Sequence, residues 1–269
     1  KYKVILDKYF EYPQNIYENL TKLRDKIKSS KDLKSFSKET KNIEKEITLF
    51  HAEVSTKVIK KSKANVDFIG FHGQTIFHNP EEKISIQLGD GKLLSRLTKK
   101  RVVYDFRKND LKKGGHGAPL TPIFHGLIAH KFKLRLPVIF VNIGGITNAT
   151  YLLNSFNINK INQKDYKKWY AKDLCPGNCL IDKWIRKHSK KNFDINGKIA
   201  KSGKINEIKL LKGLNNYPDI PKRSLDIKDF NLSFVDNLSL KDGAATLTEY
   251  TAEAFSDSLG YFFQKPVVI

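Results

Sequence analysis

The sequence predicts an α/β protein with mixed β-sheets flanked by helices. Short runs rich in β-branched and aromatic residues alternate along the chain with segments whose apolar residues recur at helical spacing. Hydrophobic residues make up 40% of the 269 residues, which is enough to build a core. This length fits two domains of ordinary size or one large domain.

The first half of the chain predicts two long helices among short strands. Residues 1–12 alternate and predict a strand, and the apolar spacing after Pro13 predicts a helix. Residues 42–60 predict a second helix with the apolar stripe Ile43, Ile47, Phe50, Val54 and Val58. The following segments are predicted as strand–turn–strand over "VDFIGFHGQTIFHNP", a strand over "ISIQLGD", a helix over "GKLLSRLT", a strand over "VVYDF" and a loop over "KNDLKKGGHGAPLTP".

The second half continues the alternation. "LTPIFHGLIAHKF" predicts a helix, and "VIFVNIGGITNATYLL" predicts two strands joined by a Gly-Gly turn. A helix is predicted from about Asn178 to Asn192, and the Lys-rich span 187–204 predicts a surface loop. Further helices are predicted over "INEIKLLKGL" and "DGAATLTEYTAEAFSDSLGYFF", with an irregular connection between them and a strand at "PVVI".

The net charge of +21 raises the alternative of a non-catalytic protein that binds nucleic acid or other anionic ligands. Only seven of the 49 basic residues are Arg, whose planar fork suits base-edge contacts better than a flexible ammonium group. The lysines are scattered, so we interpret them as solvated faces with a general attraction for anions such as nucleotides.

A membrane-spanning helix needs about 18–20 apolar residues in a row. The longest apolar run in the chain is the short "LPVIFV". A disulfide between its two cysteines, only four residues apart, would do little to stabilise a secreted fold, so a reducing cytoplasm is expected. The first residues carry charges where a signal peptide would be apolar. The absence of Met leads us to expect that both ends are incomplete.

Four glycine-containing turns, "GFHGQT", "GGHGAP", "NIGGITN" and "CPGN", suggest loops that converge on a polar ligand, although each could merely connect two elements. In "VNIGGITNAT", the backbone amides of Gly144 and Gly145 could hold phosphate oxygens, with Thr147 and Asn148 adding polar groups. The alternative is a tight hairpin with glycine at positive φ. The segment fits neither the Walker A nor the Rossmann pattern.

"DFRKND" places Arg107 between Asp105 and Asp110, either as a salt-bridged corner or as an arginine held to donate to a sugar or carboxylate. Four histidines in this half show no metal-ligand spacing, so no metal site is predicted. They are His72, His78, His116 and His125. A serine nucleophile elbow is also lacking.

In "DLCPGNCLID", the spacing of Cys175 and Cys179 predicts neither structural zinc nor a thioredoxin-like pair. Asp173 is predicted at the lip of a loop before a helix N-terminus, where a carboxylate can face a ligand and the amides of the turn can face an anion. An ordinary capping or solvated Asp is the alternative.

In this order, the motifs resemble those of the anhydro-N-acetylmuramic acid kinases of bacterial cell-wall recycling. The resemblance covers nearly the whole chain, through "GFHGQTIFHNP", "IQLGD", "VVYDFRKNDLKKGGHGAPLTPIFH", "VNIGGITNAT", "PGNCLIDKW", "KDFNLSF" and "DGAATLTEYTA". It implies the two-domain fold of the actin-like ATPase and sugar kinase superfamily, with a ligand cleft between the domains. We place these domains at residues 1–132 and 133–269.

The resemblance implies ATP-dependent phosphorylation of O6 of 1,6-anhydro-N-acetylmuramic acid while water opens the anhydro bridge, with Mg²⁺ accompanying ATP. Asp173 falls at the catalytic base, and Gln74, Thr75 and Arg107 fall at the sugar site. The implied nucleotide residues are Gly144, Gly145, Thr147, Asn148, Gly177 and Asn178. The implied protein is cytoplasmic, has small-molecule partners rather than nucleic acid or membrane, and could form a homodimer.

The chain departs from the family pattern at four places. Leu174 and Cys175 stand where the family usually has Thr and Gly, and His116 stands where a Gln is usual. The Ser-Gly-Thr-Ser phosphate loop and the Gly-rich adenosine segment of the family are absent from the sequence, which we interpret as an incomplete record or a fragment.

Overall fold

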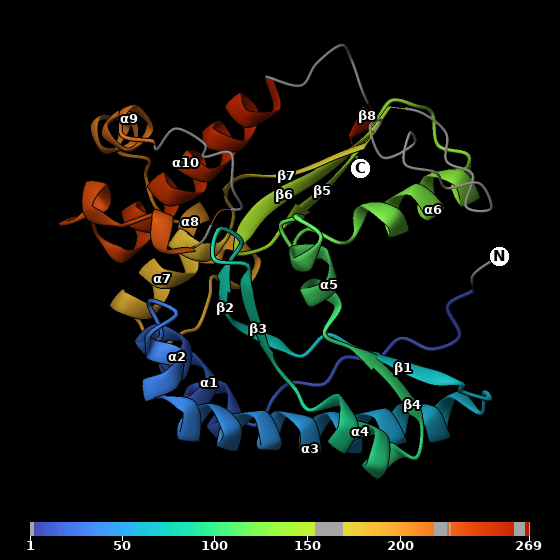
Figure 1. Ribbon diagram of the computed structural model, residues 1–269. Coiled ribbons are helices and arrows are strands. Elements are labelled where there is room, and N and C mark those ends of the chain that lie inside the picture. The colour runs from blue at the N-terminus through green and yellow to red at the C-terminus, as the bar shows by residue number, and fades with distance from the viewer. Residues whose placement is uncertain (1–2, 154–168, 218–224, 226, 261–266, 269) are drawn as a thin grey trace. The chain divides into compact units, whose positions relative to one another are not determined.

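The structure is a computed structural model that describes residues 3–153, 169–217, 225, 227–260 and 267–268. The prediction of a mixed α/β protein is confirmed, since helices alternate with small sheets (Figure 1). The chain divides into two compact units between Ala118 and Pro119, and each is described by itself. The predicted division into domains at residue 132 stays a prediction.

Unit 1 combines helices with two two-stranded sheets. Strands β1 and β4 pair in parallel, and β2 and β3 pair antiparallel with an irregularity between Thr75 and Phe77. The elements are α1 (Gln14–Lys26), α2 (Asp32–Ser35), α3 (Ser37–Ser62), β1 (Phe68–Phe71), β2 (Gln74–Asn79), β3 (Ile84–Leu88), α4 (Gly91–Thr98), β4 (Arg101–Tyr104) and α5 (Phe106–Lys112).

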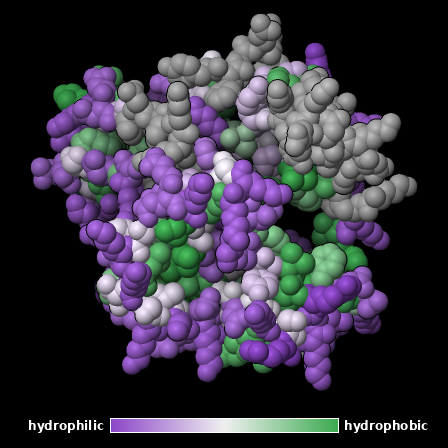
Figure 2. All heavy atoms as spheres, viewed as in Figure 1, coloured by the Kyte–Doolittle hydropathy of each residue, from purple (hydrophilic) through white to green (hydrophobic). Residues whose placement is uncertain are grey.

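The core of unit 1 lies between the long helix α3 and the strands. Ile43 and Ile47 of the predicted stripe are buried there, because residues three to four apart share one face of a helix. They pack with Leu23 of α1 and Leu88 of β3. The opposite face of α3 is solvated, and Figure 2 shows mainly hydrophilic side chains along the lower edge of the view, where α3 lies.

Two predictions for unit 1 are wrong. Residues 3–12 form no strand, and Val4 and Ile5 are 68% and 66% exposed, since sequence alternation makes a strand only where a partner edge receives it. Part of the predicted loop is the helix α5, which Asp105 precedes in a left-handed conformation with φ 60°. The glycines of this loop follow the helix rather than prevent it.

Unit 2 is built on a sheet with strand order β7-β6-β5-β8. The pairs β7–β6 and β6–β5 are antiparallel, whereas β5–β8 is parallel. The elements are α6 (Pro122–Phe132), β5 (Val138–Ile143), β6 (Ile146–Leu152), β7 (Trp169–Pro176), α7 (Cys179–His188), η3 (Ile195–Gly197), α8 (Lys198–Lys201), α9 (Glu207–Asn215), η4 (Ile227–Asp229), η5 (Ser233–Val235), α10 (Leu240–Gly260) and β8 (Val267–Val268).

Both faces of this sheet are covered. Cross-strand partners share a face, so Val138, Leu152 and Trp169 form one apolar row, which packs against α6. On the other face, Ile139 and Ala149 pack with Ala254 of α10. A further core joins α7, α9 and α10 around Trp184, whose indole nitrogen donates to the Leu240 carbonyl at 3.0 Å.

The predicted helices at α1, α3, α4, α6, α7, α9 and α10 are confirmed, as is the strand–turn–strand of β5 and β6. Strand β7 was not predicted, and the predicted surface loop over residues 187–204 contains η3 and α8. Within the described residues, no helix is long and apolar enough to cross a membrane.

Candidate functional site

A polar row crosses the sheet of unit 2 at the end next to the Gly-Gly turn. Asn148 on β6 pairs with Asn142 on β5 and with Asp173 on β7. Because paired residues point to the same face, the three side chains line up on the face that α6 covers farther along the strands. The row therefore ends an otherwise apolar face.

A bulge in β7 separates Asp173 from the core. The register shifts between Thr147 and Asn148, so that Leu174 is the extra residue. Leu174 and Cys175 are consequently both buried, at 1% and 0% exposure, although they are neighbours in a strand. Asp173 was predicted at the lip of a loop just before a helix N-terminus, but it lies within β7, directly before the bulge, and the strand continues to Pro176.

The Asp173 carboxylate is half-buried and held in place. Its Oδ2 accepts a hydrogen bond from the backbone N–H of Leu225 at 2.9 Å. The carbonyl of the following residue, Leu174, accepts hydrogen bonds from the Tyr217 hydroxyl and the Ser258 hydroxyl, both at 3.1 Å. These bonds fix the backbone of the bulge and so the direction of the Asp173 side chain.

The start of α7 is bonded to the Gly-Gly turn. The backbone N–H of Gly177 donates to the Gly145 carbonyl at 3.0 Å, and that of Asn178 donates to the Gly144 carbonyl at 2.7 Å. The next N–H, of Cys179, also donates to Gly145 at 3.2 Å. The expectation that these amides point at an anion is therefore wrong, because the fold itself uses them. These hydrogen bonds join the "CPGN" turn to the Gly-Gly turn of "NIGGITN".

The glycines of these motifs differ in what they allow. A Cβ on Gly177 would lie 2.2 Å from the Gly144 carbonyl oxygen, so glycine is required for packing there. A Cβ on Gly144 would lie 3.5 Å from Asn142 Nδ2, and one on Gly145 would lie 3.6 Å from Ile227 Cδ1. Both distances are ordinary van der Waals contacts. Neither of these two glycines has the positive φ that a tight hairpin with glycine would need. Among the described residues of unit 2, no contact therefore requires glycine at 144 or 145.

Thr147 lies on the opposite side of β6 from Asn148, as neighbours in a strand do. It is fully buried, and its hydroxyl oxygen has no well-aligned hydrogen-bond partner among the described residues. Burial raises the pKa of the Cys175 thiol, its cross-strand partner on β7, and a weak contact with Thr147 offsets only a small part of that rise. A role of Thr147 toward nucleotide stays a prediction.

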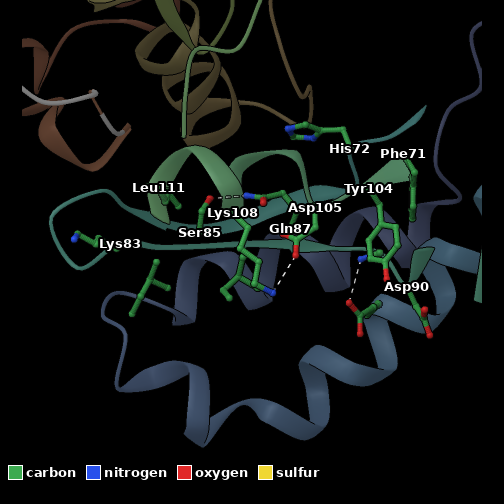
Figure 3. Close-up of a pocket in the computed structure, with 14 residues that line it drawn as sticks. Phe71, His72, Lys83, Ser85, Gln87, Asp90, Tyr104, Asp105, Lys108 and Leu111 are labelled. Atoms are coloured by element: carbon green, nitrogen blue, oxygen red, sulfur yellow. Dashed lines mark hydrogen bonds and ion pairs between the residues drawn. The ribbon is translucent and has the colours of Figure 1, made fainter. Parts of the chain in front are cut away.

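In unit 1, a cavity of about 520 Å³ lies between β3, α5 and the strand ends (Figure 3). Polar groups converge on it: Gln87 Nε2 donates to the Ser85 hydroxyl at 2.7 Å, and Lys108 pairs with Asp105 at 3.0 Å. The lining residues are Glu44, Phe71, His72, Lys83, Ile84, Ser85, Ile86, Gln87, Gly89, Asp90, Tyr104, Asp105, Lys108 and Leu111.

The three predicted sugar residues lie around this cavity but do not line it. Thr75 accepts a long hydrogen bond of 3.4 Å from Gln87, and Arg107 lies 3.4 Å from His72 Nε2. Gln74 instead donates to the Tyr12 hydroxyl at 3.1 Å, because it points to the other face of β2. Thr75 therefore contacts the lining residue Gln87, and Arg107 contacts the lining residue His72.

The acidic neighbours of Arg107 have other partners. Asp105 pairs with Lys108, whereas the Asp110 carboxylate accepts from the Gly117 N–H at 2.7 Å. A Cβ on Gly115 would lie 2.2 Å from the same carboxylate. Asp110 thus organises the "GGHGAP" loop.

Comparison of the sequence with known proteins identifies the family of the chain. The sequence model for "Anhydro-N-acetylmuramic acid kinase" matches residues 1–266. The chain belongs to the anhydro-N-acetylmuramic acid kinase family. A protein of that name from Pelagibacter ubique is 50% identical over 254 residues, which is 93% of this chain and 65% of the relative. One from Rhizobium etli is 40% identical over 85% of this chain and 60% of the relative, and one from Brucella canis is 37% identical over 84% and 60%.

The chain spans 60–65% of the length of these anhydro-N-acetylmuramic acid kinases. Within the described residues, no three His, Cys, Asp or Glu side chains gather as a metal site would require. The polar residues that the sequence reasoning missed are Asn142, two positions before the Gly-Gly turn, and the lining residues Gln87 and Lys108. Asn142 could have been found from strand alternation, because it shares its face with the apolar residues Val138 and Phe140.

Leu174 and Cys175 have a structural role in unit 2. Leu174 and Cys175 fill the core beneath the bulge, against Ile139 and Ala254. Burial raises the pKa of the Cys175 thiol to about 11, and burial likewise raises that of Cys179 to about 11. Both thiols stay protonated at neutral pH, so neither is an activated nucleophile.

Proposed function

We propose that the whole protein, of which this chain is at least a part, is an ATP-dependent kinase of 1,6-anhydro-N-acetylmuramic acid. It transfers the γ-phosphoryl group to O6 while water opens the 1,6-anhydro bridge at C1, giving N-acetylmuramic acid 6-phosphate. The observation that carries the proposal is the glycine pair Gly144–Gly145. No contact with the described residues requires these glycines, and they lie beside the polar row that contains Asp173 in a chain of this family.

The nucleotide phosphates are assigned to the Gly-Gly turn. The lack of side chains at Gly144 and Gly145 leaves room for phosphate oxygens to reach the backbone, with Asn148 beside them on the open face. Thr147 and Gly177 support the turn from behind, and the exposed Asn178 adds a side-chain amide at its edge.

Asp173 is proposed as the general base. One carboxylate oxygen takes a proton from the attacking water as the water oxygen bonds to C1. The C1–O6 bond breaks, and O6 bonds to the γ-phosphorus as ADP leaves. The hydrogen bond from Leu225 supports this role because it orients the carboxylate without neutralising it.

The sugar is assigned to Gln74, Thr75 and Arg107 of unit 1. An amide, a hydroxyl and a guanidinium group together match a ligand that carries hydroxyls, an acetamido group and a carboxylate. The cavity beside Thr75 and Arg107 offers further hydrogen-bonding groups, whereas Gln74 points to the other face of β2.

Mg²⁺ is expected to accompany ATP. We expect the ion to be held mainly by phosphate oxygens and water, as Mg²⁺ bound with a nucleotide usually is. The bound ion would supply charge neutralisation at the transferred phosphoryl group.

The actin-like two-domain arrangement with a ligand cleft, divided at residue 132, is part of the proposal. So is a cytoplasmic location, where ATP is available. A homodimer is a further prediction, which sedimentation of the full-length protein tests. The family match gives no support to the alternative of a non-catalytic binder of nucleic acid.

The decisive experiment incubates the full-length protein with ATP, Mg²⁺ and 1,6-anhydro-N-acetylmuramic acid in H₂¹⁸O. We expect ADP release only with the sugar, and one ¹⁸O atom at C1 of the product by mass spectrometry. ADP release without sugar, or a phosphorylated product that keeps its anhydro bridge, would contradict the proposal.

A further inference from the structure

Gln74 ends a chain of hydrogen bonds that starts on α3. His51 Nε2 lies 2.7 Å from the Tyr12 hydroxyl oxygen, and Gln74 Nε2 donates to the same oxygen at 3.1 Å. The three residues come from α3, the N-terminal segment and β2. Neither Tyr12 nor His51 belongs to a motif assigned to a ligand.

The single proton of the Tyr12 hydroxyl gives this chain a direction. Because the oxygen accepts from Gln74, its proton is donated to His51 Nε2, which must be the unprotonated nitrogen of a neutral ring. Burial lowers the pKa of His51 and so favours the neutral form. The ring packs against Phe50 on its own helix, Phe71 on β1 and Tyr12, and among these only Tyr12 titrates.

One end of the Gln74 carboxamide is occupied by Tyr12, and the other end is open. Gln74 is half-buried, and among the described residues its Oε1 has no hydrogen-bond partner. Gln74 Oε1 is not one of the buried side-chain atoms without a hydrogen-bond partner, so this oxygen is accessible to solvent. The carboxamide is therefore fixed at its nitrogen and presents its oxygen.

We propose that Tyr12 and His51 are positioning residues that hold Gln74 with Oε1 toward the sugar, as the acceptor for a hydroxyl or for the acetamido N–H. The inference rests on the proposed function, which assigns Gln74 to the sugar. If His51 instead carried its proton on Nε2, Tyr12 would donate to Gln74. The amide would then present its NH₂ group, and the polarity of the contact would be reversed.

The tautomer of His51 tests the direction of the chain without any ligand. Two-bond ¹H–¹⁵N correlation spectra of the full chain, with the signal assigned by its loss in His51→Gln, should show Nδ1 protonated and Nε2 unprotonated. A protonated Nε2 at neutral pH overturns the inference.

Steady-state kinetics with ATP and 1,6-anhydro-N-acetylmuramic acid test the consequence. Tyr12→Phe and His51→Leu should raise the sugar KM about 5–10-fold, as expected for one misplaced hydrogen bond, and change kcat less than about twofold. His51→Gln should restore the KM, because its carboxamide can accept in place of Nε2. Tyr9→Phe, at a position that is 84% exposed, is the matched control.

The outcomes separate the two proposals. An unchanged KM in Tyr12→Phe, where Gln74→Ala raises it, overturns the positioning role and leaves the proposed function standing. A wild-type protein without sugar-dependent ATP consumption overturns the proposed function, and the His51 tautomer then decides the positioning by itself. Thermal denaturation identifies a variant that fails to fold, in which case His51→Leu and the tautomer carry the test.

Discussion

Asp173 and Asn148 lie opposite one another across β7 and β6, one residue before a bulge that buries Leu174. The bulge separates the carboxylate on the open face from two buried neighbours that pack into the core. The position proposed as the general base is therefore adjacent in sequence to positions that pack into the core. Substitutions should separate an effect on turnover at Asp173 from an effect on stability at its buried neighbours.

Asp173→Asn should fold normally and bind ATP and sugar, since the amide oxygen can still accept from Leu225. Turnover should fall by about 10²–10⁴-fold, which is the usual contribution of a positioned base. Initial rates of ADP release measure this, with Asp236→Asn as the control, because Asp236 is half-buried and paired with Lys187. Near-normal turnover in Asp173→Asn would remove the carboxylate from the mechanism.

Gly177→Ala should lower stability, whereas Gly144→Ala should weaken ATP binding. The new Cβ at 177 meets the Gly144 carbonyl, so unfolding free energy should drop by about 1–3 kcal/mol. Gly144→Ala should change it by less than about 0.5 kcal/mol, because the space is open. Its ATP KM should nevertheless rise about tenfold through lost contacts to phosphate. Urea denaturation and kinetics measure the two quantities, and an unchanged KM argues against the phosphate assignment.

The cysteines should be inert in the folded protein. Because burial raises both thiol pKa values to about 11, iodoacetamide at pH 8 should label neither Cys175 nor Cys179 until urea unfolds the chain. Cys175→Ala should keep kcat, with a small loss of stability from the lost packing. Rapid labelling of the native protein together with loss of turnover would indicate thiol chemistry instead.

Arg107→Ala should mainly weaken sugar binding. Loss of a charged hydrogen-bond donor should raise the sugar KM about 10–100-fold, while the melting temperature stays close to that of the wild type. Lys112→Ala, an exposed cation on the same helix, is the control. An Arg107→Ala protein that binds sugar normally but does not fold would instead support the salt-bridged corner.

Stability should decrease as the pH falls through the histidine range. Burial lowers the pKa values of His51 and His125 in the folded protein, so below about 6.5 the unfolded chain binds more protons than the folded one. Unfolding free energy should therefore be greatest at and above pH 7 and decline toward pH 5.5. His125→Gln should reduce this slope in urea titrations, and a rise in stability over the same interval would contradict the burial of these rings.

The sequence alone determined the elements whose pattern is local. The helices α3 and α10 and the β5–β6 hairpin follow from periodicity and turn residues within one stretch of chain. The order of the motifs also identified the family. Strand β7 could not be found this way, because the bulge at Leu174 interrupts the alternation by which strands are recognised. Nor does alternation within residues 1–12 provide the partner strand that those residues would need.

The tertiary structure decided how the site residues are used. The amides of Gly177 and Asn178 were expected to face an anion, but they donate to Gly144 and Gly145, which are more than thirty residues earlier in the chain. The alignment of Asn142, Asn148 and Asp173 depends in the same way on the register of three strands, and the environment of Gln74 depends on Tyr12 and His51. The register of β7 against β6 and the partners of these groups depend on which distant segments pack together, so the spacing of residues within a single segment does not determine them.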